Sequence, residues 1–229
     1  RAEKVHLGKV ISVRIPCFRI QESAMIKVFW FLSQMIFVLS FATVTAVSAG
    51  ADLTDIPLVW KPTDAVSSYD AIDLTVFQNV TFVVHQFNDV RKKPSEIGKN
   101  IEKRSSSDVR YVSTRDNVPA WLANRFGEVL SEFEIDVVKT DGTYTLEGDV
   151  VKFYVTEESM YKADVGLKMR LLSKSGVVWE GMVTASSTRW GSSYKAENYY
   201  EGLSNAVISA VHSLLKDEAF KQAVLKNKK

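Results

Sequence analysis

One stretch, residues 161–190, constrains the fold more than any other part of the chain. From Tyr161 to Leu171, apolar residues alternate with polar residues or glycine. A period of two places alternate side chains on opposite faces of a strand, so one face is buried and the other meets water. Residues 173–176 then supply turn chemistry, and residues 177–189 return rich in valine and threonine. The sequence therefore predicts a long antiparallel hairpin on which everything else packs.

Three helices are indicated by apolar spacing and by capping residues. Residues 119–133 carry apolar side chains at three-four spacing, behind Asp116 or Asn117 as the cap. A second helix with the same spacing is expected to begin near Asn198. Asp217 is expected to cap a short last helix.

Further strands are expected at residues 71–87, 135–138 and 143–156. Apolar residues fall on both faces of the first, which predicts a central strand covered by helix on one side. Residues 88–117 are polar and are interpreted as a long loop, with a short strand at residues 111–113 as an option. The order predicts one α+β domain over residues 71–229, with a mostly antiparallel sheet of about four to five strands and two to three helices packed on one face.

The residues before this domain have the pattern of an export signal. Lys27 and a mostly apolar run over residues 28–47 follow Met25, and residues 47–49 are small at the two positions that matter for cleavage before Gly50. We interpret residues 1–24 as an upstream non-native or disordered extension, 25–49 as a signal peptide and 50–70 as an extended N-terminal arm. A retained inner-membrane signal anchor is the alternative, because the apolar run is long enough to span a bilayer.

Charge argues against nucleic acid as a partner. Residues 1–49 hold six of the 29 Lys and Arg and two of the 27 Asp and Glu, so the remainder has 23 basic and 25 acidic residues and a net charge of −2. Nucleic-acid binding therefore loses its electrostatic basis. The same remainder lacks cysteine, because Cys17 lies in the upstream stretch. An exported, periplasmic domain of this size folds without disulfides.

No catalytic, cofactor-binding or metal-binding residues are predicted. The pattern contains no HExxH motif, no nucleophile elbow and no phosphate-binding loop. His85 and His212 are isolated, which is more typical of structural residues than of ligands. Glu157 and Glu158 could form a carboxylate pair, but adjacent residues on a turn normally point apart, so we expect both to be solvated.

Two groups of residues are candidate interaction sites. The first is a basic cluster in the 88–117 loop, which could touch anionic head groups or an acidic partner, or could be a solvated surface balanced by nearby acids. The second is an aromatic junction after the hairpin, which could be an interface anchor or the core where a helix docks on the sheet. The candidates are Asp89, Arg91, Lys92 and Lys93 in the loop, and Trp190, Tyr194, Tyr199 and Tyr200 at the junction.

The run from Phe87 to Arg91, followed by Ile97-Gly98, resembles the start of the YajG-type envelope lipoproteins. The strand pattern of residues 163–187 and the helix pattern of residues 200–220 resemble the same family, which is related to auxiliary lipoproteins of ABC-type envelope transporters. The resemblance implies a non-enzymatic periplasmic domain at or near the outer membrane. It also implies a salt link between Asp89 and Arg91. The lipid-bearing cysteine of the family is missing, because residues 48–50 are Ser-Ala-Gly.

The sequence therefore predicts a non-enzymatic periplasmic accessory or binding protein. Its expected partner is an envelope protein, with membrane-surface contact as a further option, and its oligomeric state is left open. One alternative is a lipid or small-ligand carrier with a cavity between the sheet and the 119–133 helix. The other is an enzyme whose site is not visible in the sequence.

Overall fold

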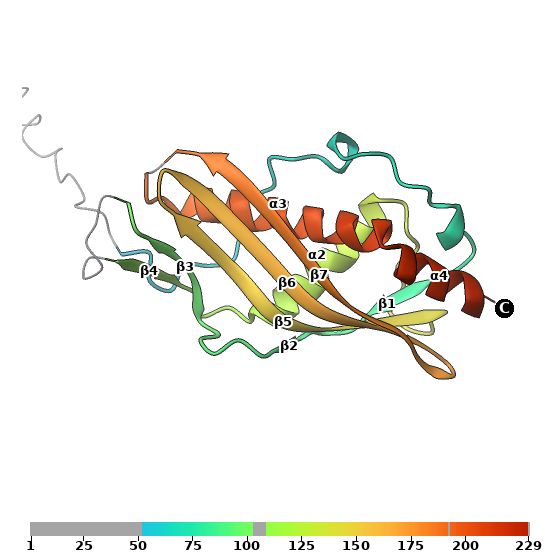
Figure 1. The fold of residues 1–229 in the computed structure, drawn as a ribbon. Helices are drawn as coiled ribbons and strands as arrows, with labels where there is room; N and C mark the ends of the chain where they lie inside the picture. The colour runs from blue at the N-terminus through green and yellow to red at the C-terminus, as the bar shows by residue number, and fades with distance from the viewer. Residues whose placement is uncertain (1–51, 103–108, 192, 229) are drawn as a thin grey trace, which may run out of the picture. The chain divides into compact units, whose positions relative to one another are not determined.

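The computed structural model describes residues 52–102, 109–191 and 193–228, which form an α+β arrangement of one sheet and three helices (Figure 1). The upstream stretch and the expected signal peptide or anchor lie outside these residues. None of the helices in the described ranges combines the length and apolar character needed to span a bilayer.

The predicted hairpin is confirmed as the centre of the sheet. Strand β6 (Met160–Ser173) pairs antiparallel with β7 (Gly176–Trp190) and, on its other side, with β5 (Tyr144–Glu157). Five apolar side chains of β6 turn toward the helices and are almost fully buried: Ala163, Val165, Leu167, Met169 and Leu171. Gly176, at φ 112°, allows the turn between the two strands, because glycine adopts positive φ without strain.

The sheet is larger and more mixed than the sequence indicated. It has seven strands, in the order β4-β3-β5-β6-β7, and β1 and β2 also lie beside β5. Three short strands run parallel to β5 along one of its edges: β1 (Phe82–Val84), β2 (Asn88–Asp89) and β3 (Glu96–Asn100). The predicted number of strands, four to five, was therefore too low, and the sheet is more mixed than predicted. The reason is that β5 is long enough to pair with three short strands in succession.

The expected long loop and first strand also need correction. Residues 88–117 contain β2, β3 and β4 (Arg110–Ser113), and β3 and β4 form an antiparallel pair. Only three residues of the region 71–87 are strand, preceded by the 3₁₀ turns η1 (Val66–Ser68) and η2 (Thr75–Phe77). The strand expected at 135–138 is a single bridge between Phe82 and Val137.

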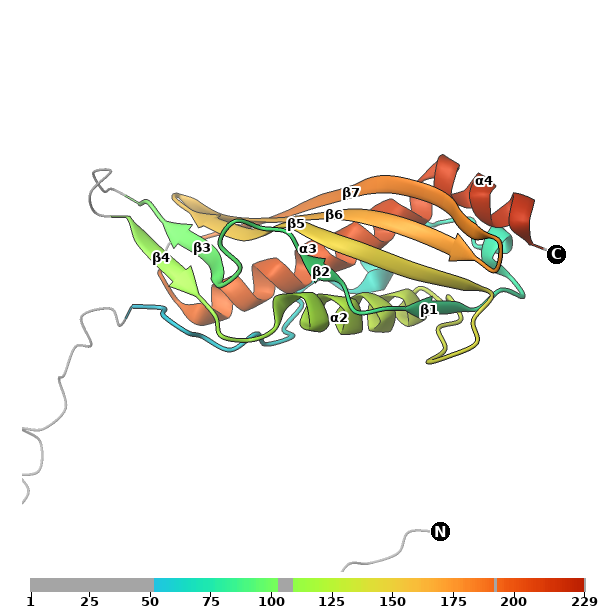
Figure 2. The same ribbon diagram turned by 90° about the horizontal axis from the view of Figure 1, so that it is seen from below.

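The helices cover one face of the sheet, as predicted. Helix α2 (Val118–Glu132) and helix α3 (Ala196–Lys216) lie beneath the strands in Figure 2. Asn117 caps α2 by accepting a 3.0 Å hydrogen bond from Ala120 N, which selects one of the two expected caps. Asp217 caps α4 (Glu218–Asn227) in the same way, accepting a 2.6 Å bond from Phe220 N.

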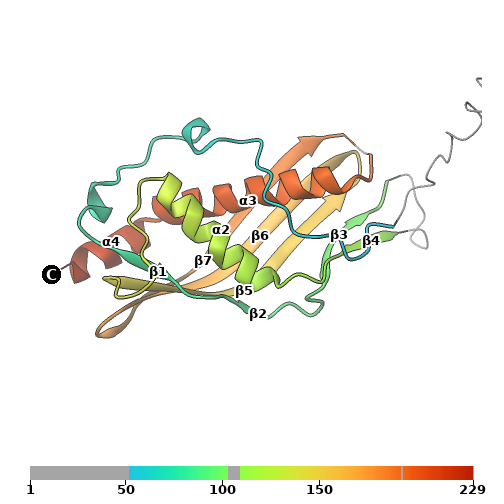
Figure 3. The ribbon, with the colours of Figure 1, turned by 180° about the vertical axis from the view of Figure 1, so that it is seen from behind.

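The described part of the N-terminal arm, which includes the 3₁₀ turn η1, packs on the helix layer. Trp60 is half-buried, and its ring centre lies 5.9 Å from that of Trp121 on α2. Further along, Lys61 N donates to Ser204 on α3, and Asn205 accepts from Thr63 N. Figure 3 shows the arm crossing α3. These bonds place polar side chains of α3 against the arm instead of water.

Candidate interaction site

Asp89 and Arg91 form the expected salt link, and the contacts of both side chains are structural. The guanidinium group of Arg91 binds both carboxylate oxygens of Asp89, at 2.9 and 2.7 Å, and also donates to the carbonyl of Phe153 at 3.3 Å. The side chain of Arg91 is only 8% exposed. The pair therefore fastens the segment after β2 onto β5, and little of its charge faces solvent.

The carboxyl group of Asp89 has a lowered pKa for the same reason. Burial by itself raises the pKa, but the hydrogen bonds and charge of Arg91 outweigh burial and bring the pKa below its ordinary value. A carboxylate of this kind stabilises the fold at any pH above its unfolded-state pKa. That stability is lost as pH falls through the lower, folded-state pKa.

Replacing Asp89 with asparagine is therefore expected to flatten the acid side of the stability profile. The wild-type free energy of unfolding should fall as pH drops below about 4, the ordinary value for aspartate. The variant should be less stable at pH 7 and should lose less on acidification, while Asp164, whose pKa is also lowered, keeps part of the slope. Urea unfolding at a series of pH values measures this. Parallel profiles for the two proteins would contradict the assignment.

Lys92 and Lys93 are exposed, in contrast to Arg91. Lys93 Nζ lies 2.9 Å from Glu96 and 5.1 Å from the centre of the Tyr111 ring. The hydrogen bond to Glu96, followed by the charge of Glu96, raises the pKa of Lys93. Together with Arg91 and the outer side chains of β5, these lysines line an open hollow of about 310 Å³. The basic cluster is thus partly neutralised, and Lys92 and Lys93 are its exposed members among these three.

The aromatic junction separates into a buried part and an exposed part. Tyr199 is fully buried, whereas Trp190 is 82% exposed, and Tyr194 and Tyr200 are half-buried. The separation follows from strand geometry, because Trp190 occupies an outward position at the last residue of β7, opposite Met160. The junction therefore divides: Tyr199 belongs to the core, and Trp190 is exposed, so contact between Trp190 and a partner stays a prediction.

Tyr199 explains the Ile97-Gly98 pair. Ile97 is fully buried in the core. A Cβ atom added at Gly98 would lie 2.7 Å from the Tyr199 ring and 2.9 Å from the carbonyl oxygen of Val155. Atoms this close would clash, so glycine is needed at position 98, where the Tyr199 ring of α3 packs against the sheet.

A buried glutamate organises this end of the sheet, and sequence reasoning missed it. Glu157 is fully buried, which contradicts the expectation that it is solvated, whereas Glu158 is exposed as expected. Its carboxylate accepts from the hydroxyls of Tyr161 and Tyr199, at 2.6 and 2.8 Å, and from Tyr194 N at 2.7 Å. The donors at 194 and 199 are far away in the sequence, so only the neighbouring Tyr161 offered a local signal.

The hydroxyl of Tyr199 has a raised pKa and stays protonated. Burial is the largest cause, and the negative charge of Glu157 adds to it. Tyr161 extends the network by accepting from Ser193 N and from Asn198, both at 3.0 Å. These bonds lock the start of α3 onto the β5–β6 turn, and they hold the backbone that follows Trp190 in place.

The chain also enters the domain at this end of the sheet. Leu53 N donates to the hydroxyl of Tyr194 at 3.2 Å, and Arg110 stacks on the Tyr194 ring at 4.0 Å. Tyr111, on the neighbouring strand, is 52% exposed. The sheet end thus combines an anchored interior with exposed aromatic side chains. We call three residues the aromatic end: Trp190 and Tyr111, which are exposed, and Tyr194, which is half-buried.

The two histidines among the described residues lie apart from this end. His85 is exposed, with Nδ1 3.6 Å from Glu147 on the outer face of the sheet. His212 packs beside the Tyr69 ring, at 4.9 Å, and its Nε2 lies 3.2 Å from the carbonyl oxygen of Asp70. Within the described ranges, no cluster of three or more metal-ligating side chains is present.

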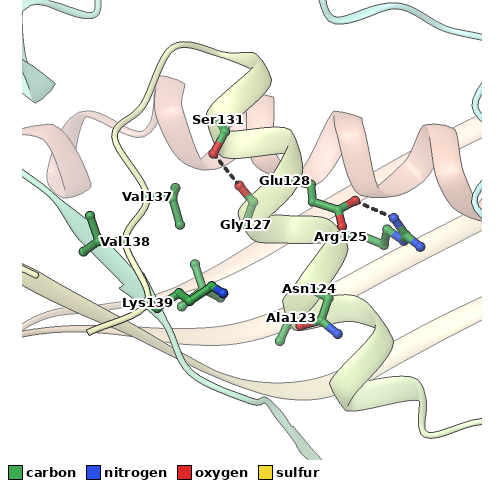
Figure 4. Close-up of a pocket in the computed structure, with 10 residues that line it drawn as sticks. Ala123, Asn124, Arg125, Gly127, Glu128, Ser131, Val137, Val138 and Lys139 are labelled. Atoms are coloured by element: carbon green, nitrogen blue, oxygen red, sulfur yellow. Dashed lines mark hydrogen bonds and ion pairs between the residues drawn. The ribbon is translucent and has the colours of Figure 1, made fainter. Parts of the chain in front are cut away.

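The space expected for a ligand beneath α2 is filled. Phe126 is fully buried and packs 5.8 Å from the Phe87 ring, and Phe133 is 7% exposed. A hollow of about 490 Å³ lies instead between α2 and residues 137–139 (Figure 4). Its lining is mixed, with Arg125, Glu128 and Lys139 beside Val137 and Val138. It is an open groove and differs from the dry apolar cavity that a lipid carrier requires.

Comparison with known proteins gives similar structures but no family. No protein-family model matches the sequence, and no curated protein matches it. One similar solved structure is a Xanthomonas campestris protein of the DUF330 family, with 18% identity, a TM-score of 0.43 and coverage of 62% of this chain and 86% of that one.

Two further similar structures come from other bacteria. A candidate lipoprotein of Caulobacter crescentus has 14% identity and a TM-score of 0.33, covering 53% of this chain and 87% of that one. PelC of Paraburkholderia phytofirmans, crystallised as a dodecamer, has 16% identity and a TM-score of 0.36, covering 58% and 85%. At these values the likeness assigns neither activity nor partner to this chain, and the YajG-type resemblance is not confirmed.

Proposed function

We propose that this chain is an accessory protein of the bacterial cell envelope. It is exported to the periplasm by the segment before Gly50 and acts without catalysis, by holding a partner protein at the aromatic end. The observation that carries the proposal is Trp190, which is 82% exposed at the last residue of β7. A large indole left in water at the end of a strand is typical of an interface anchor.

The hydrogen bonds near Trp190 support binding because they hold the start of the segment that leads into α3. The carboxylate of Glu157 and the hydroxyl of Tyr161 fix the backbone at Ser193 and Tyr194, just after the tryptophan. A pre-organised anchor loses less conformational entropy on binding than a mobile one. The candidate residues of the 88–117 region offer less to a partner, because Asp89 and Arg91 form an ion pair with each other.

Replacing Trp190 with alanine is expected to reduce recovery of the partner without affecting the fold. Truncation of an anchor of this kind weakens binding by at least about tenfold. The free energy of unfolding should stay within about 0.5 kcal/mol of wild type, because the side chain makes few contacts. Crosslinking pull-down from intact cells measures recovery, and chemical unfolding measures stability.

Val177→Ala is the matched control, because Val177 is also on β7 and 57% exposed, but at the opposite end of the strand. It should leave recovery unchanged. Equal recovery from Trp190→Ala and wild type would refute the proposed contact. Deletion of residues 88–117, the obvious test from sequence, is not informative, because it removes three strands of the sheet.

A further inference from the structure

Strand β7 is an edge strand, and among the described residues its outer edge pairs with no other strand. It runs for 15 residues and pairs only with β6. In the part of the chain that the structure describes, no other segment makes a backbone hydrogen bond with it. Figure 1 shows β7 as the outermost strand on its side. Its free N–H and C=O groups can therefore pair with another strand.

The opposite edge of the sheet, in contrast, is covered by another segment of the chain. Strand β4 is only four residues long, and the N-terminal arm lies along it. Ile56 N donates to the carbonyl of Ser113 at 2.8 Å, and Ser113 N donates to the carbonyl of Leu53 at 3.0 Å. The chain thus covers its short edge and leaves its long edge open.

The open edge also lacks the usual protection against pairing. Exposed edges normally carry charged residues, proline or bulges that prevent association. Between Glu180 and Arg189, the eight residues 181–188 contain no charge and no proline, and the ladder with β6 is regular there. Thr184, Ser186 and Thr188 are exposed on the outer face, together with Met182 at 55%.

We infer that β7 pairs antiparallel with β7 of a second copy of this chain, across a two-fold axis at Thr184. Two antiparallel edge strands related by such an axis keep both helix layers on the same side of a continuous sheet. This register places Met182 opposite the partner's Ser186 and Glu180 opposite the partner's Thr188. Thr184 meets its own copy, a favourable cross-strand pair.

Self-pairing suits this segment because no like charges meet. Glu180 and Arg189 lie outside the eight uncharged residues, and Arg189 is already bound to Glu201 at 2.8 Å. The eight residues span about 27 Å at 3.4 Å per residue, enough for a continuous ladder. The inference uses neither Trp190 nor Glu157 and stands independently of the proposed function.

Cysteine crosslinking tests both the pairing and its register. The full chain with Cys17→Ser provides a cysteine-free background. Thr184→Cys should form a disulfide-linked dimer under mild oxidation. Met182→Cys mixed with differently tagged Ser186→Cys should crosslink, whereas either alone should not, because like positions would be about 14 Å apart. Absence of these crosslinks, together with a monomer mass in sedimentation at all concentrations, would overturn the inference.

A charge placed on the edge gives a second readout. Thr184→Lys should weaken self-association by at least tenfold in sedimentation. Thr145→Lys is the control, because Thr145 lies on the same outer face of β5, with strands on both sides, and should leave the mass unchanged. A dimer that withstands Thr184→Lys would contradict the inference. So would an equal loss from both variants, because it would place the contact elsewhere.

Discussion

Replacing Glu157 with alanine is expected to lower the free energy of unfolding by about 3–5 kcal/mol, the largest effect of any substitution considered. The change leaves three donors without their acceptor in a fully buried site: the hydroxyls of Tyr161 and Tyr199 and the backbone N–H of Tyr194. Each buried donor left unsatisfied costs about 1–3 kcal/mol. The start of α3 should loosen from the sheet as a result.

Urea unfolding of Glu157→Ala and wild type measures the effect, and Glu158→Ala is the control. Glu158 is the neighbouring residue, has the same side chain and is exposed, so its replacement should change stability by no more than about 0.5 kcal/mol. Hydrogen exchange should localise the loss to the start of α3. If Glu157→Ala and Glu158→Ala were equally stable, the network would have no structural importance.

Replacing Arg91 with alanine is expected to cost about 3 kcal/mol. The guanidinium group satisfies the carboxylate of Asp89 and reaches the carbonyls of Pro94, Glu96 and Phe153. Removing one member of a largely buried ion pair leaves the other charge uncompensated, which costs about 3–5 kcal/mol for full burial and less here, where Asp89 is 14% exposed.

Arg91→Lys should recover only a small part of this stability, because a lysine cannot bind both carboxylate oxygens in the planar geometry of a guanidinium group. Lys92→Ala is the control, since Lys92 is exposed next to the pair and should be neutral. Chemical unfolding distinguishes the three variants. A neutral Arg91→Ala would show that the pair is a surface ion pair of little worth.

The elements that the sequence predicted correctly are those that local signals define. The hairpin follows from alternation within β6, and α2 and α4 follow from apolar spacing behind Asn117 and Asp217. Each of these signals lies within a few residues of the element it specifies. The link between Asp89 and Arg91, which the family resemblance implied, also joins residues that are only two apart.

The features that the sequence did not reveal depend on distant partners. Strands β1, β2 and β3 exist because β5 lies beside them, and strands of two to five residues leave little periodic pattern. Glu157 is buried because Tyr199, 42 residues further on, presents its hydroxyl. A sequence of adjacent glutamates on a turn carries no sign of this, so the ordinary expectation of solvation was wrong.

The candidate site was predicted in part. The aromatic junction was correctly located between the sheet and α3, but its members could not be sorted into buried and exposed. Sorting them requires the outward register of Trp190 on β7 and the packing of Tyr199 against Gly98. Fold and contact surface are therefore linked, since the network that buries Tyr199 also fixes the backbone beside Trp190.

Photo-crosslinking from position 190 in intact cells is the most direct test of the proposed function. A photoreactive aromatic residue in place of Trp190 should yield one discrete adduct with an envelope protein, and the same residue in place of Val177 should not. Adducts with lipid alone would indicate that Trp190 contacts the membrane surface and not a partner protein. No adduct from position 190, in a protein exported and folded as wild type, would contradict the claim that this end of the sheet is the contact surface.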